Sequence, residues 1–347
     1  MLKTRIFLHK LANWEYWPQQ IVYIPVYLQW IWYSLRARSV FFFNASNPSI
    51  KNGGFFMESK KEIYDMLPIG TYPKTSFVAM EMSAEEAIDS FQISKIDFPV
   101  IAKPNMGQRG TAVKKLHSLD EISAYAKRAT FDFLIQECIP FENEIGIFYV
   151  RYPHEQLGKI TGIVAKEFLS VTGDGVSTIE KLLQKDFRHA MQASAIAKEI
   201  GAGMHEILPM GKKRKLVPFG NHIRGSKFTD ASHLITPKLV EAINAICLEI
   251  PDFYFGRLDV MFENWRDLEN GKKYAIIEIN GASSEPTHIY DPKHSIFFGW
   301  KELTRHLRYM FEIASINKRK GVSYLSRKDG IREYREYVAH NKKFVDF

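Results

Sequence analysis

The sequence predicts an α+β fold built mainly on antiparallel sheets. Strand-like and helix-like segments are mixed along the whole chain, with no internal repeat and no low-complexity linker. Two alternating segments, 256–262 and 274–281, are separated by a polar stretch that suits a hairpin loop. The chain has 347 residues and is 46% hydrophobic and 25% charged. This composition is typical of a globular protein that is long enough for two or three domains.

Charge and cysteine content limit the class of protein further. The only cysteines, Cys138 and Cys247, argue against a disulfide scaffold and favour a reducing compartment. We therefore expect a cytoplasmic protein, with possible peripheral attachment at the inner membrane face. The formal net charge of +8 favours anionic ligands, lipid surfaces or nucleic acid. Since no nucleic-acid-binding module is recognisable, we expect no nucleic-acid partner.

Residues 1–68 are expected to form a helical, aromatic N-terminal region without the form of a signal peptide. The segment 21–33 is strongly apolar and is followed by Arg36 and Arg38. It is interrupted by Pro25 and is too short for a comfortable membrane span, which needs about 20 residues. Two interpretations stay open: a helix packed on the body of the protein, or an interfacial anchor through residues 20–43.

The remaining elements follow from local signals. Ser83 and Glu86 form the pattern of a capping box before a helix at 83–91, and Ser118 and Glu121 repeat it before a helix at 118–129. Other helices are expected at 60–67, 177–186, 188–200, 237–250 and 301–316, and strands at 98–104, 133–136, 145–151 and 160–170. The strand at 98–104 leads into a glycine-rich loop at 105–111.

The hairpin carries the first half of a candidate site. Residues two apart in a strand share a face, so Arg257 lies beside Asp259, and Glu278 beside Asn280. With the turn at the middle of the polar stretch, Asp259 faces Glu278 and Arg257 faces Asn280. Two carboxylates at that distance repel each other unless a cation joins them, and hard oxygen ligands indicate Mg²⁺. The alternative is a solvated sheet face. The reverse face is expected to be core: Leu258, Val260, Phe262, Ala275, Ile277 and Ile279.

The second half is a candidate nucleotide site. Lys103 closes a strand just before the glycine loop, in which Gly107, Arg109 and Gly110 suit a phosphate-binding turn or, equally, a plain hairpin. Glu137 and Ile139 lie where a strand passes into a linker that can face an adenine ring. Three positive groups, Lys103, Lys166 and Arg257, could then surround a triphosphate.

In this order, the motifs resemble the ATP-grasp superfamily, and most closely D-alanine–D-alanine ligases and cyanophycin synthetase-type ligases, over residues 70 to 315. The stretch 171–182 looks like the cyanophycin synthetase version. The resemblance implies two α+β subdomains that clasp ATP between antiparallel sheets. We accordingly expect a small lid subdomain at 69–158, a large subdomain with the metal site at 159–316, and a basic tail at 317–347.

The resemblance also implies roles for individual residues. Lys103 and Lys166 would hold the ATP phosphates, and Arg257 would stabilise the transferred phosphoryl group. The remaining roles are as follows: Glu137 and Ile139 would frame the adenine, Glu144 would bind the ribose, Gly107, Arg109 and Gly110 would lie in the lid, and Asp259, Glu278 and Asn280 would bind two Mg²⁺ ions (Mn²⁺ being possible), with Glu278 bridging.

The implied activity is that of a carboxylate–amine ligase that works through an acyl phosphate, with a small molecule or peptide as each substrate. His222 and Arg224 would border the phosphate or acceptor site, or form a structural turn, and Arg109 could hold a carboxylate. Glu285 and His288 could touch the acceptor. The lid is not serine-rich, and the continuation after Asn280 differs from that of the ligases, so D-alanine is not expected as a substrate. The alternatives are a kinase on the same scaffold and a membrane-associated ATP-binding protein with little turnover.

Overall fold

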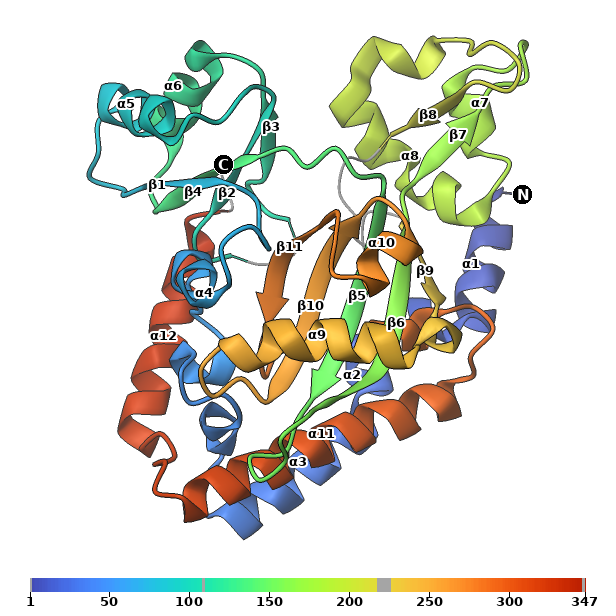
Figure 1. The fold of residues 1–347 in the computed structure, drawn as a ribbon. Helices are drawn as coiled ribbons and strands as arrows, with labels where there is room; N and C mark the ends of the chain where they lie inside the picture. Colours follow the sequence, from blue (N-terminus) through green and yellow to red (C-terminus); the bar gives the residue numbers. More distant parts are fainter. Residues whose placement is uncertain (1, 108–109, 217–225, 345–346) are drawn as a thin grey trace.

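A computed structural model describes residues 2–107, 110–216, 226–344 and 347, and arranges them around three sheets (Figure 1). All strand pairs in this described part are antiparallel. The prediction of an α+β fold with antiparallel sheets is therefore confirmed. Arg109, His222 and Arg224, for which the sequence predicts site roles, lie outside the described residues.

The largest sheet has five strands in the order β11-β10-β5-β6-β9. Its strands are β5 (Asn143–Val150), β6 (Lys159–Glu167), β9 (Lys227–Asp230), β10 (Phe255–Phe262) and β11 (Tyr274–Asn280). Helix α9 (Pro237–Glu249) crosses one face and buries Leu239 and Ile243 in the main apolar core (Figure 1). The opposite face meets helix α11 (Ile296–Arg319) through Phe148 and Phe255. The predicted boundary at residue 158 falls between β5 and β6, two neighbouring strands of this one sheet.

The second sheet has the order β1-β4-β2-β3, with β1 (Thr75–Val78), β2 (Val100–Pro104), β3 (Lys114–Leu116) and β4 (Phe133–Glu137). Helices α5 (Ala84–Ser94) and α6 (Leu119–Arg128) cover one side of it (Figure 1). The capping box of α5 is confirmed. That of α6 is incomplete, because the Glu121 carboxylate accepts from the backbone N–H of His117 instead of Ser118.

A third, separate lobe lies between β6 and β9 in the chain. It contains β7 (Ser170–Thr172), β8 (Lys213–Lys215), α7 (Ile179–Leu183) and α8 (Phe187–Ile200), and it has its own apolar cluster. The strand expected at 160–170 is therefore interrupted, since β6 ends at Glu167 and β7 begins at Ser170.

The N-terminal region is helical, as predicted, with α1 (Leu2–Ala12), α2 (Gln19–Val22), α3 (Ile24–Ala37) and α4 (Lys60–Met66). Helix α3 packs along α11, and the Tyr33 ring stacks on Phe311 with centroids 4.1 Å apart. The expectation of a helix packed on the body is thus met on this inner face. In the described part of the chain, no helix combines the length and apolarity needed to cross a membrane.

Two segments expected to be irregular contain helices. The hairpin loop holds the short helix α10 (Trp265–Glu269), which is capped by Asn264. The predicted basic tail is largely helix α12 (Arg327–Lys342), which runs from the end of α11 back toward the four-stranded sheet (Figure 1). Phe344 is buried there against Phe131, with ring centroids 4.8 Å apart. The C-terminal segment is therefore part of the packed fold.

Candidate functional site

The hairpin β10–β11 has the predicted register. Arg257 is paired with Asn280, and Asp259 with Glu278. The four side chains therefore share one face of the five-stranded sheet. Their assigned roles stay predictions, but the juxtaposition on which those roles depend is present.

A β-bulge directly after this pair corrects the expected core of β11. Val260 pairs with Ile276, which leaves Ile277 as the extra residue. Ile276 consequently enters the main core in place of Ala275 and Ile277. The backbone carbonyl of Ile277 accepts hydrogen bonds from Lys103 Nζ (3.1 Å) and from the Tyr64 hydroxyl (2.5 Å). The bulge thus joins the five-stranded sheet to β2 of the four-stranded sheet.

Strands β5 and β6 extend the polar face beside β10. Lys166 Nζ lies 2.6 Å from Glu144 Oε1 and 3.2 Å from Asp259 Oδ1. Gly146 is paired with Asp259, and a Cβ at that position would lie 3.0 Å from both Asp259 Oδ1 and Arg257 Cδ. The glycine leaves the space in which the arginine and aspartate side chains meet.

Asp259 is held between two cations. Arg257 donates to both of its carboxylate oxygens, from Nε at 2.9 Å and from Nη2 at 3.1 Å, while Lys166 approaches from β6. Burial alone would raise the pKa of Asp259, but the Arg257 and Lys166 charges outweigh it and lower that pKa. The pKa of Lys166 is raised, because Asp259 and Glu144 outweigh the opposing effect of burial. Asp259 and Lys166 are therefore both charged at neutral pH.

Glu278 and Asn280 have fewer polar partners than Asp259. The Glu278 side chain is 33% exposed, and its nearest cation is Lys60 Nζ at 3.4 Å. Asn280 Nδ2 is buried and has no hydrogen-bond partner among the described residues. Two carboxylates and an amide on one sheet face form a donor set that fits a hard divalent cation. Asp259 is the weakest of the three as a ligand, because its oxygens already have cationic partners. Among the described residues, no group of three histidine, cysteine or acidic side chains gathers as a metal site.

Lys103 lies on the other side of this site, on β2. Its ammonium group is buried and donates to the Tyr64 hydroxyl (2.9 Å) as well as to the Ile277 carbonyl. Burial lowers the pKa of Lys103 to about 8, against the weaker opposing effect of Glu278. A phosphate group brought to this position would favour the charged ammonium form.

We expect ATP affinity to depend on the protonation of Lys103. In the wild-type protein, affinity should fall as pH rises from 7 to 9, because the ammonium is lost around pH 8. Lys103→Met should weaken ATP binding about tenfold at pH 7, as expected for a lost charge-assisted hydrogen bond, and flatten this part of the pH profile. Isothermal titration calorimetry across the pH range measures both effects. Lys115→Met, at an exposed position on β3, is the matched control. Equal affinities and pH profiles in the Lys103 variant and the wild type would refute the role.

The other residues predicted to contact the nucleotide lie on or after β4, on β5 and in the lid loop. Glu137 ends β4, and its carboxylate accepts from the backbone N–H of Lys74 at 3.2 Å. Ile139 follows it, half-buried. Glu144 is buried as the partner of Lys166, so its contacts are those of a charge partner, and its ribose role stays a prediction. Gly110, at the far side of the lid loop, has a φ of +69°.

Sequence inspection missed Lys60 and Tyr64, both on α4. Lys60 Nζ donates to the Gly107 carbonyl at 2.7 Å and reaches Glu278, so it connects the lid loop to the hairpin. Their spacing of four residues places both on one face of the helix, but that pattern alone does not point to a site.

The loop after Asn280 is supported by the N-terminal region. The backbone N–H groups of Ala282 and Ser283 donate to the carbonyls of Gly53 (2.9 Å) and Gly54 (3.0 Å). A Cβ on Gly54 would lie 2.7 Å from the Gly281 Cα, so the two backbones meet without intervening side chains.

Glu285 lies in this loop, close to Arg257. Its backbone carbonyl accepts from Arg257 Nη1 at 3.3 Å. Its carboxylate accepts from the hydroxyls of Tyr23 and Tyr290, the latter at 2.7 Å. The Tyr23 contact joins residues 262 positions apart, and no local signal could have indicated it.

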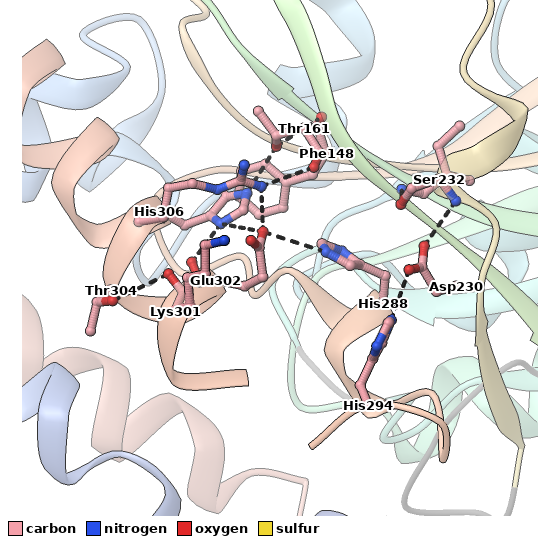
Figure 2. Close-up of polar contacts among 12 residues, drawn as sticks. Phe148, Thr161, Asp230, Ser232, His288, His294, Lys301, Glu302, Thr304 and His306 are labelled. Atoms are coloured by element: carbon pink, nitrogen blue, oxygen red, sulfur yellow. Dashed lines mark hydrogen bonds and ion pairs between the residues drawn. The ribbon is translucent and has the colours of Figure 1, made fainter. Parts of the chain in front are cut away.

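His288, predicted to touch the acceptor, is buried. Figure 2 shows it directed at Glu302, whose carboxylate oxygen is 3.6 Å from His288 Nε2. His306 bonds to Thr161 (2.8 Å) in the same buried network, and burial lowers the pKa of His306 to about 3. The acceptor role of His288 stays a prediction; its contacts in the structure are those of a buried support for the sheet.

The comparisons with known proteins give likenesses of fold. No protein-family model matches the chain, and no curated protein matches it. Similar solved structures include a D-alanine–D-alanine ligase from Bacillus anthracis, with 14% identity and a TM-score of 0.42 over 76% of this chain and 68% of that one. VanG D-Ala:D-Ser ligase from Enterococcus faecalis matches with 14% identity and a TM-score of 0.41, over 73% of this chain and 61% of that one.

A bifunctional glutathione synthetase from Pasteurella multocida matches with 13% identity and a TM-score of 0.41, over 76% of this chain. The chain spans only 36% of the length of that protein. These likenesses concern the fold alone, and all three TM-scores are below 0.5.

Proposed function

We propose that this chain is an ATP-dependent ligase that joins a carboxylate to an amine through an acyl-phosphate intermediate. The observation that carries the proposal is the register of β10 and β11, which brings Arg257, Asp259, Glu278 and Asn280 to one sheet face. Lys166 extends that face, and Lys103 approaches it from the other sheet. This is the inventory of charges that phosphoryl transfer needs.

We assign the cationic residues to the phosphates, and the carboxylates and the amide to the metal. Lys103 and Lys166 would hold the phosphates, and Arg257 would stabilise the phosphoryl group in transfer. Glu278, Asn280 and Asp259 would hold two Mg²⁺ ions, or two Mn²⁺ ions in their place. A bound divalent ion would act as a Lewis acid and stabilise the charge on the phosphates. Lys60, beside Glu278 and the lid loop, would keep the loop close to the hairpin.

The chemistry proceeds in two displacements. An oxygen of the substrate carboxylate attacks the γ-phosphorus of ATP, the bond to the β-phosphate oxygen breaks, and ADP leaves. The amine then attacks the acyl carbon, inorganic phosphate leaves with the bonding electrons, and the nitrogen loses a proton. Water must be excluded between the steps, because it would hydrolyse the acyl phosphate.

Glu285 supports an acceptor on the Arg257 side of the site. Its carboxylate is anchored by Tyr23 and Tyr290, next to the loop that follows Asn280. A carboxylate at this place would attract the amine substrate in its ammonium form and orient it, and the nitrogen would lose a proton to solvent before it attacks the acyl carbon.

We expect ADP release to depend on both substrates. The full-length protein with ATP and Mg²⁺ is screened against pools of carboxylates, with and without pools of amino acids, polyamines and other amines, and product masses are read in parallel. A ligase releases stoichiometric ADP and phosphate only with a matching pair, and the product mass equals both substrates minus water. ADP release with a stable phosphorylated product and no need for an amine would instead identify a kinase. Tight ATP binding without turnover in any pool would favour the ATP-binding alternative.

A further inference from the structure

Helix α3 has two apolar faces, and the described residues of the protein cover only one of them. On the inner face, Val26, Trp30 and Tyr33 pack into the aromatic core beside α11. The outer face of α3 consists of six exposed large apolar side chains: Ile24, Tyr27, Leu28, Ile31, Trp32 and Leu35. Leu28 is 65% exposed and Leu35 69%. A helix that is apolar on both faces is normally in contact with an apolar environment on both, in a protein core or in a membrane.

The outer face of α3 is continuous and uncharged. Positions 24, 28, 31 and 35 follow helical spacing and form one stripe. No charged residue occurs between Ile24 and Leu35. Gln29, one of the few polar residues here, donates its side-chain amide to the Tyr33 hydroxyl. Single exposed apolar residues are ordinary, whereas a contiguous stripe of them marks a contact surface.

The charge around this stripe indicates what it contacts. Arg36 and Arg38 follow it directly, and both are exposed, with the Arg36 guanidinium over the Phe311 ring, 5.3 Å from its centroid. The whole chain carries a formal charge of +8. Tyr27 and Trp32 are residue types that favour the headgroup level of a bilayer. Arginines next to apolar and aromatic side chains match the surface of an anionic membrane. A second copy of the chain fits less well, because it would bring another molecule of the same large positive charge to this face.

We propose that the outer face of α3 docks on the surface of an anionic lipid bilayer. The inner face is fixed on α11, so the helix lies along the surface with its apolar stripe at the boundary between headgroups and acyl chains. Arg36 and Arg38 contact lipid phosphates at the C-terminal end of the stripe. This inference does not depend on the proposed ligase activity.

Vesicle co-sedimentation of the full-length protein tests the docking. Vesicles of phosphatidylcholine alone are compared with vesicles containing 30 mol% phosphatidylglycerol, a composition chosen to about match an anionic leaflet. The wild type should bind the anionic vesicles. The double variant Leu28→Glu, Ile31→Glu should lose at least about tenfold of that binding, because it removes two apolar contacts and adds two negative charges. Ile93→Glu is the matched control, since Ile93 is 80% exposed on α5, and it should bind like the wild type.

A second variant measures the electrostatic contribution to vesicle binding. Arg36→Gln with Arg38→Gln should reduce binding to the anionic vesicles by about fivefold per arginine. It should leave binding to pure phosphatidylcholine unchanged. Melting temperature and circular dichroism verify that all variants are folded.

Two outcomes would overturn the proposal. One is equal vesicle binding by the wild type and the Leu28→Glu, Ile31→Glu variant. The other is a wild type that does not bind anionic vesicles. If light scattering then shows a dimer that this variant dissociates, the face is covered by a second copy of the chain.

Discussion

Replacing Glu278 with glutamine is expected to reduce ATP turnover at least about a hundredfold while leaving the fold intact. The glutamine keeps the size of the side chain but removes the charge that would bind a divalent ion, and such a loss of charge stabilisation at a transferring phosphoryl group costs about this much. Stability should change by less than about 1 kcal/mol, because Glu278 is partly exposed and its ion pair with Lys60 spans 3.4 Å.

The measurements are steady-state ADP release and thermal unfolding. Glu263→Gln is the matched control: it lies at the loop end of the same hairpin, where Glu263 pairs with the exposed Lys273. Its turnover should equal that of the wild type. A Glu278→Gln protein that retains turnover within about threefold of wild type would remove Glu278 from the proposed metal site.

Replacing Asp259 with alanine is expected to abolish turnover and also to destabilise the protein, by about 3–5 kcal/mol. The structure places Asp259 in the buried sheet face between Arg257 and Lys166, so that alanine leaves Arg257 without its carboxylate partner and Lys166 with Glu144 alone. Urea unfolding measures the loss of stability.

The double variant Asp259→Ala, Arg257→Met separates the two effects, because Lys166 keeps Glu144 as its partner. Removing the cation that lost its counter-ion should recover part of the lost stability, but none of the turnover. Destabilisation below about 1 kcal/mol in the single variant would show that the Arg257–Asp259–Lys166 group is not a closed buried network in solution.

Most of the hairpin could be predicted, because its information is local. Strict alternation fixes which residues share a face, and the polar stretch between the strands fixes the register, so the pairing of Asp259 with Glu278 followed from sequence. The bulge at Ile277 could not be predicted from alternation, because Ala275, Ile276 and Ile277 are all apolar and fit either face of the strand. Asn264, three residues before Asp267, was a local signal for the helix in the loop, and could have been used.

The remaining contacts depend on tertiary structure. Lys103 meets the Ile277 carbonyl 174 positions away, and Tyr23 meets Glu285, 262 positions away. Such contacts are fixed by tertiary packing, and a single sequence carries no periodic or local pattern that indicates them. The basic composition after Lys318 indicated a solvated tail, and the few aromatic residues that bury its end, such as Phe344, were outnumbered by charges.

The packing of Phe344 and Phe347 on the four-stranded sheet has a consequence for biogenesis. Phe131, central to that small core, contacts both rings, with centroids 4.8 and 5.1 Å away. This core therefore cannot close before residue 347 has been synthesised, although its strands leave the ribosome early. During translation, the nascent sheet exposes apolar side chains that ribosome-associated chaperones can shield.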